Sequence, residues 1–231
     1  MTEEVPAHDP LRADSRLRTP HAMAAAGIIF SVLAIAALVL LKVSVPAHAA
    51  APGAWLTNSR RRGTVAIALN LIPFAGIAFL WFVGVLRDQF GGRESRFFAT
   101  VFLGSGLLYV GMMLAGAAVA GGLIASQASS GPLAGGVLAV GRHITFLLVN
   151  VYATRMAAVF TFSTVTIARA TKIVARWLTI AGLASGLVLL VLAGTVPWLE
   201  LLFPAWVLAV SIDIIVRRSR ASAGRNPARP A

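Results

Sequence analysis

The hydrophobic positions of this chain form six long apolar stretches separated by short polar segments. A helix rises about 1.5 Å per residue, so about 20 apolar residues cross the roughly 30 Å hydrocarbon layer of a bilayer. Each stretch reaches or approaches that length. The pattern predicts an all-α, polytopic membrane helix bundle with six transmembrane helices, at about residues 22–41, 64–86, 97–125, 143–168, 177–195 and 198–216.

The composition agrees with one membrane domain, over residues 21–216. Hydrophobic residues make up 58% of the chain and charged residues only 12%, whereas a soluble domain has about a quarter charged residues. The tails, 1–20 and 217–231, are rich in Pro, Ala and charge, which predicts two disordered segments. The chain has no cysteine, which excludes disulfides, thiolate metal sites and cysteine nucleophiles.

The distribution of basic residues predicts the orientation. In a six-helix topology, the two tails and the segments at 87–96 and 169–176 share one side and hold 14 of the 20 Lys and Arg residues. The positive-inside rule places that side, with both termini, in the cytoplasm. Flanking cations also predict contact with anionic phospholipid headgroups. Nucleic-acid binding is not expected, because the chain offers no folded basic face.

Two features near the first two helices leave alternatives open. The basic triplet at 60–62 falls on the outer side, where it either contacts lipid phosphates or binds a specific anionic ligand or partner. Ala47, His48 and Ala49 resemble a signal-peptidase site after the first apolar stretch. That stretch is longer than a typical signal peptide and Lys42 interrupts it, so an uncleaved helix is favoured over cleavage.

Small residues predict where helices approach closely, because transmembrane helices associate through them. The fifth helix carries Gly182 and Gly186 in a GxxxG pattern. The third helix has one small-residue face, made of Gly104, Gly111, Ala115, Ala118 and Gly122. Both faces predict packing within the bundle, with a homodimer seam as the alternative.

The fourth helix carries two polar stripes and is therefore expected to be the most enclosed helix. One stripe contains Thr145, Tyr152, Arg155, Ser163 and Thr166, and the other contains His143, Asn150, Thr154 and Thr161. Arg155 lies about 21 Å from Arg169, well inside the hydrocarbon, and needs a partner. Asp213 is the one clearly intramembrane acid, so an Arg155–Asp213 pair is one candidate.

These positions give a candidate intramembrane polar site formed by Asn70, Tyr109, Tyr152, Arg155 and Asp213. Asn70 lies beside the kink that Pro73 predicts near Leu69, and Tyr109 is nearly level with Arg155. In one interpretation Arg155 joins the bundle through carbonyls and hydroxyls. In the other, Arg155 faces a cavity that receives an anion, a carboxylate or a phosphate headgroup.

Sequence motifs for catalysis or cofactor binding are absent. The chain has no HExxH, no GxxxxGK[ST] and no GxGxxG in a suitable context. His21 and His143 fall at opposite membrane faces, and only one acid lies clearly inside the membrane. The sequence therefore predicts no cofactor, no metal site and no enzymatic activity.

Four strings resemble a group of uncharacterised bacterial multi-pass membrane proteins to which no activity is assigned. They are 70–84 (NLIPFAGIAFLWFVG), 96–108 (RFFATVFLGSGLL), 155–160 (RMAAVF) and 196–206 (VPWLELLFPAW), within about 60–210. The resemblance implies a bacterial cytoplasmic membrane.

Two functions are expected from these observations. The first is a non-catalytic membrane component, such as a scaffold, sensor or accessory subunit. The second is a small transporter or channel that uses Arg155 to handle an anionic or lipid-like solute. The expected partners are the lipid bilayer, anionic phospholipid headgroups, and either a second copy or another membrane protein.

Overall fold

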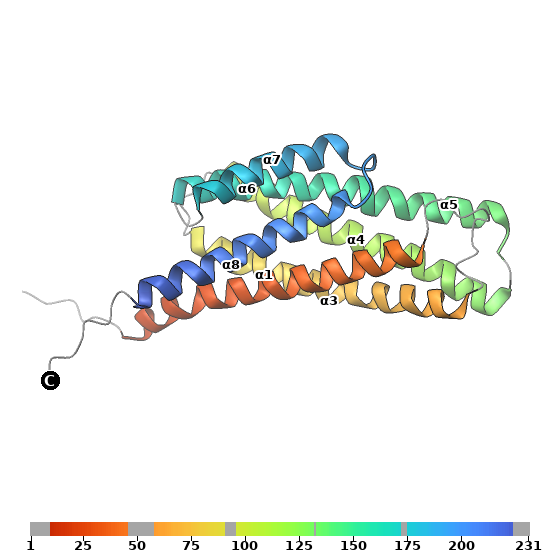
Figure 1. Ribbon diagram of the computed structural model, residues 1–231, viewed down its shortest axis with the longest axis horizontal. Helices are drawn as coiled ribbons and strands as arrows, with labels where there is room; N and C mark the ends of the chain where they lie inside the picture. The colour runs from red at the N-terminus through yellow and green to blue at the C-terminus, as the bar shows by residue number, and fades with distance from the viewer. Residues whose placement is uncertain (1–9, 46–57, 91–95, 132, 172–174, 224–231) are drawn as a thin grey trace, which may run out of the picture.

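The computed structural model of the protein (Figure 1) describes residues 10–45, 58–90, 96–131, 133–171 and 175–223. These residues form helices and a few turn residues, with no strand among them. The helices are α1 (Pro10–Ser44), α3 (Ser59–Phe90), α4 (Arg96–Ser130), α5 (Gly135–Phe146), η1 (Leu147–Ala153), α6 (Thr154–Thr171), α7 (Arg176–Leu192), η2 (Leu199–Leu201) and α8 (Leu202–Ala223).

Five helical segments in the described residues are long and apolar enough to span a membrane. They are Ala22–Ser44, Ser59–Asp88, Phe97–Ser129, Gly135–Arg169 and Leu199–Arg217. The remaining apolar helix, α7, has 17 residues, about 26 Å of length. The predicted all-α membrane bundle is confirmed, with the α5, η1 and α6 helices together forming the fourth predicted helix.

Most of the helices are longer than the apolar stretches predicted, although α7 ends at Leu192 rather than at 195. Helix α1 begins at Pro10 rather than at about 22, α5 begins at Gly135 rather than at 143, and α8 continues to Ala223. Hydropathy marks the part of a helix suited to lipid, whereas backbone hydrogen bonding continues into polar flanks. The predicted tail disorder is therefore wrong for 10–20 and 217–223, while 1–9, 224–231 and the signal-peptidase-like Ala47–His48–Ala49 lie outside the described residues.

The six long segments form a closed ring in chain order. Each packs against the next, from α1 through α3, α4, α6, α7 and α8, and α8 packs back against α1. Both ends of the described chain lie at one end of the bundle, on the left in Figure 1, which we call the terminus end. Helix α5 lies at the opposite end, the α5 end, and extends past the turn between α7 and α8.

Aromatic side chains fill the centre of the ring. Phe79 of α3 lies 4.8 Å from Phe30, 5.1 Å from Phe160 and 5.7 Å from Phe203, measured between ring centroids. Tyr109 of α4 joins the cluster 5.3 Å from Phe79. Each pair adds about 0.5–1.5 kcal/mol beyond the burial of its area. The cluster thus connects α1, α3, α4, α6 and α8 at mid-height.

Small residues behave differently on the two helices where close packing was predicted. Gly182 and Gly186 of α7 are buried against Val165 and Phe162 of α6, as predicted. On α4, Gly104, Gly111 and Gly122 have open space where a Cβ would stand, and Ala115 and Ala118 are exposed. The predicted packing of this α4 face within the bundle is wrong, because α4 turns its other side, with Phe102 and Gly106, toward α6.

Candidate functional site

The structure disperses the five residues of the predicted polar site. Tyr109 is buried in the aromatic core. Asn70 is exposed on α3, and its side-chain amide donates to the Ala66 carbonyl of the same helix at 2.8 Å. That bond provides the amide with an acceptor inside its own helix, so Asn70 needs no partner from a neighbouring one.

Arg155 and Tyr152 lie on the outer surface of the bundle. Both are exposed, and neither has a hydrogen-bond or ion-pair partner among the described residues. Gly106 of α4 lies against Phe160, and Gly116 lies against Val149. Because Arg155 falls between Phe160 and Val149 on the antiparallel neighbour, it is level with the stretch of α4 around Gly111.

The prediction that the fourth helix is the most enclosed is therefore wrong. Its exposed stripe includes Tyr152, Arg155 and Thr166. Its buried hydroxyls need no neighbour, because Thr161 donates to the Ala157 carbonyl and Thr164 to the Phe160 carbonyl, each at 2.8 Å. Such bonds to the carbonyl four residues earlier let polar residues occupy a packed helix face without a polar partner.

Asp213 pairs with residues near the terminus end, and not with Arg155. Its Oδ2 accepts from Nε of Arg217 at 2.7 Å and from the backbone N–H of Ala175 at 3.2 Å. Ala175 is the residue that precedes α7 and has no side-chain cap of its own. Asp213 therefore places a negative charge at the N-terminus of α7, where free N–H groups and the helix dipole favour it.

Substituting Asp213 by alanine is expected to lower the free energy of unfolding by about 1–2 kcal/mol, as the loss of a helix cap does. Asp213→Asn should lose less, because the amide oxygen still accepts from Ala175. The measurement is equilibrium unfolding of the purified protein in mixed micelles. Asp88→Ala, at an exposed position near the end of α3, is the matched control. An equal loss in both alanine variants would contradict the capping role.

A second polar cluster, formed by Lys42, Glu200 and Asn150, was not predicted. Lys42 Nζ lies 2.7 Å from Oε1 of Glu200 and donates to Oδ1 of Asn150 at 3.3 Å. Glu200 is 8% exposed and Lys42 28%. The ion pair joins the end of α1 to the start of η2, and the amide of Asn150 brings in η1.

Irregular backbone positions two of the three members, Asn150 and Glu200, whereas Lys42 lies on the regular helix α1. Residues 147–153 form a π-helix, η1, and just after it Oγ1 of Thr154 donates to the Val149 carbonyl five residues earlier. Such π-turns are frequent at functional sites. Trp198, two residues before Glu200, has a φ of 69°, a left-handed conformation that is costly for a bulky residue. The cluster depends on these two local deviations from regular helix.

The turn before η2 packs closely on the π-helix. Gly194 has a φ of 81°, and a Cβ at this position would lie 2.7 Å from Cγ2 of Val151. Only glycine combines this conformation with so close an approach. The contact positions the turn, and with it Glu200, against η1.

A cavity of about 240 Å³ opens beside the cluster. Its walls combine apolar side chains with a few convergent polar groups. It is lined by Leu38, Leu41, Lys42, Val45, Val65, Ala120, Leu123, Arg142, Thr145, Phe146, Val149, Asn150 and Glu200. Arg142 of α5 has no hydrogen-bond or ion-pair partner among the described residues. Apolar walls with a few placed polar groups are typical of small-molecule sites.

The cluster lies at the far boundary of the hydrocarbon, counted from the terminus end. Asn150 is 19 residues from Arg169, and Glu200 is 17 residues from Arg217, which correspond to about 25–29 Å of helix. Arg142 is eight residues further along the same segment. The cavity therefore extends from the level of the lipid chains to that of the headgroups.

The sequence contained a signal for two residues of this site, Lys42 and Glu200. Lys42 ends the first apolar stretch and Glu200 begins the last, so a six-helix topology places opposite charges at the same face. Nothing in the sequence indicated that Asn150 would join them, because the direction of its side chain depends on the π-helix η1. No group of three or more His, Cys, Asp or Glu side chains suited to holding a metal occurs in the described ranges.

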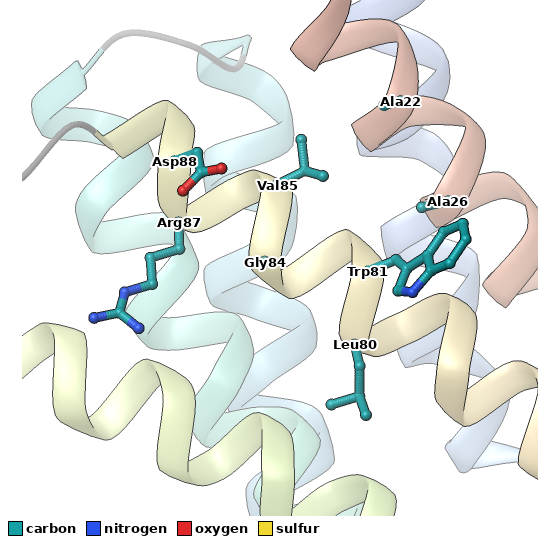
Figure 2. Close-up of a pocket in the computed structure, with 8 residues that line it drawn as sticks. All are labelled: Ala22, Ala26, Leu80, Trp81, Gly84, Val85, Arg87 and Asp88. Carbon is teal, nitrogen blue, oxygen red and sulfur yellow. The ribbon is translucent and has the colours of Figure 1, made fainter.

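Another hollow, of about 510 Å³, lies at the terminus end between α1 and α3. Figure 2 shows Trp81 lying close to Ala26 of α1, and the Arg87 and Asp88 side chains on the last turns of α3. Trp81 is 71% exposed, as an indole at a membrane interface is. We assign this surface to the lipid boundary, because its two charged groups do not converge on a common point.

Comparison of the chain with protein-family models, curated proteins and solved structures found no match.

Proposed function

We propose that the protein is a non-catalytic component of a bacterial cytoplasmic membrane, with both termini in the cytoplasm, that assembles with another transmembrane protein. The docking face is the outer surface of α4 and α6, defined by Gly104, Gly111, Ala115, Ala118 and Arg155. The observation that carries this proposal is the outward position of Arg155 at mid-membrane depth.

The energetics of Arg155 favour a protein occupant for this face. A central arginine costs about 2.5–3.5 kcal/mol on insertion scales, and its guanidinium does not lose its proton. Within the described residues its side chain has no carboxylate beside it. A carboxylate on a neighbouring helix would offset that cost through paired hydrogen bonds.

The adjoining surface of α4 suits the approach of a helix. Gly104 and Gly111 have open space at the Cβ position, and Ala115 is exposed. Stripes of small residues let two transmembrane helices come into backbone contact. Arg155 is level with Gly111 along the bundle, so a helix packed on this stripe would have the guanidinium at the depth of its own middle.

The acidic residues of the chain indicate that the occupant is a different protein. Glu200 is paired with Lys42, and Asp213 is paired with Arg217. A second copy would therefore bring no free intramembrane carboxylate to Arg155. We expect the partner to carry an Asp or Glu near the middle of one transmembrane helix.

The transport alternative has less support. The cavities at the two ends of the bundle and the small ones beside Tyr109 have no lining atom from Arg155. An arginine that handles a transported anion would face such a cavity.

The test is photocrosslinking in native membranes from position 115. A crosslinking amino acid at Ala115 is expected to capture one membrane protein, and the same group at Ile77, exposed on α3, should capture lipid only. Arg155→Leu is expected to reduce the crosslinked product by about tenfold or more, because it removes a charged hydrogen bond. Arg155→Lys should retain much of it.

A charge exchange provides the decisive control. Arg155→Glu should abolish the crosslink, and replacing the acidic residue of the captured helix by arginine should restore it. If positions 115 and 77 gave the same lipid adducts, or if Arg155→Leu left the protein adduct unchanged, the proposal would be rejected.

A further inference from the structure

We propose that the cavity at the α5 end binds a single-chain amphiphile with an anionic head, either a carboxylate or a phosphate. This site lies between α1, α3, α4 and α5, away from the proposed docking face. Its ligand and its test are therefore independent of the partner protein.

The charges around the cavity select an anion. Lys42 and Glu200 neutralise each other at 2.7 Å, so Arg142 provides the net charge of the cavity. Arg142 is partly buried and has no acceptor among the described residues. A guanidinium binds carboxylate and phosphate oxygens through paired N–H groups.

The second donor of the site is positioned by the polar cluster. Glu200 holds the Lys42 ammonium at the cavity wall, and Asn150 accepts another of its three N–H groups. The third N–H has no acceptor among the described residues and is available to the head of a ligand. Two donors from different helices, Lys42 and Arg142, thus converge on one cavity.

The apolar walls select an alkyl chain. Leu38, Leu41 and Val149 line the cavity near the polar cluster, and Leu123 and Val65 line it near Gly141, at the level of Arg142. Arg142 stands about 12 Å further along the helix than Asn150. Apolar side chains thus line the cavity along its length, which suits an alkyl chain, and Arg142 and Lys42 provide cations for an anionic head.

The volume of the cavity favours a ligand with one alkyl chain over a lipid with two acyl chains. Its volume of about 240 Å³ is below the roughly 300–1,000 Å³ of sites for drug-sized molecules. A phospholipid with two acyl chains exceeds that space. We therefore assign the site to a free single-chain amphiphile and not to a membrane phospholipid.

The experiment measures binding to the full chain by native mass spectrometry in a neutral detergent. The probes are dodecyl phosphate, dodecanoate, dodecanol, dodecyltrimethylammonium and phosphatidylglycerol. We expect one bound dodecyl phosphate or dodecanoate per chain, with an affinity about tenfold or more above that of dodecanol. Preferential binding of phosphatidylglycerol would overturn the single-chain assignment.

Three variants distinguish this site from general adsorption. Arg142→Gln should weaken binding of both anions about tenfold, while Arg142→Lys should recover part of it. The matched control Arg60→Gln, exposed on α3 outside the cavity, should change nothing. Ala120→Phe fills the cavity from α4 without changing any charge, and should abolish binding while the protein still folds.

The same data can refute the proposal. Equal binding of dodecyl phosphate and dodecanol would remove the role of the cations. Binding that survives both Arg142→Gln and Ala120→Phe would place the amphiphile elsewhere on the bundle.

Discussion

Replacing Lys42 with methionine is expected to lower the free energy of unfolding by about 3 kcal/mol. The substitution leaves the carboxylate of Glu200, only 8% exposed, without its cation, and breaking a buried ion pair costs about 3–5 kcal/mol. We take the lower end of that range because Lys42 itself is 28% exposed. The measurement is equilibrium unfolding of the purified protein in mixed micelles.

The double variant Lys42→Met with Glu200→Gln tests whether the loss of stability comes from the unpaired carboxylate of Glu200. Neutralising Glu200 should restore about half or more of the stability, because a neutral pair avoids the uncompensated buried charge. Arg60→Met, at an exposed position of the same end, should cost less than about 0.5 kcal/mol. Equal losses from Lys42→Met and Arg60→Met would refute a structural role for the ion pair.

The Lys42–Glu200 pair also illustrates how far hydropathy predicts a membrane fold. Apolar stretches of about 20 residues correspond to helices because lipid leaves the backbone no other hydrogen-bond partner. The alternation of six stretches then fixes which helix ends share a face. The apolar stretches predict the helix bundle, and their alternating direction predicts that Lys42 and Glu200 lie at the same end of it. The ion pair itself was not predicted.

Helical periodicity was a poorer guide to the environment of polar residues. Period alone identifies which side chains share a stripe, such as Tyr152, Arg155 and Thr166, but not which neighbour covers it. In α6 the buried polar side chains are hydroxyls, and Thr161 and Thr164 bond carbonyls of their own helix. The charged stripe faces outward. The π-helix at 147–153 adds a rotation that a regular 100° period does not contain.

Small residues were equally ambiguous in the sequence. The stripe on α4 is open, while Gly27, Ser31 and Ala34 of α1, which were not singled out, form a close contact face. Both faces have suitable spacing, so the choice depends on the shape of the helix opposite. For Gly27 the opposing side chains are Ser211 of α8 and Phe82 of α3, both fully buried.

Gly27→Ala is accordingly expected to be strongly destabilising, by about 2–3 kcal/mol, the upper part of the range for overpacking a tight contact. A Cβ at position 27 would overlap Oγ of Ser211 and lie 2.9 Å from Cδ2 of Phe82. Ser211 already donates to the Val207 carbonyl at 2.8 Å and Phe82 is fully buried. Neither side chain has free space, so α1 would have to move away from α8.

The matched control is Gly104→Ala, also within a membrane-spanning helix. Nothing lies within 4 Å of a Cβ there, so alanine should stabilise α4 by up to about 1 kcal/mol through its higher helix propensity. Gly27→Ala combined with Ser211→Gly removes the closest overlap and should recover part of the loss, which a double-mutant cycle measures. If Gly27→Ala and Gly104→Ala changed stability in the same direction and by similar amounts, close packing between α1 and α8 would be disproved. The opposite signs follow from one physical difference, since the same methyl group meets a filled contact on α1 and open space on α4.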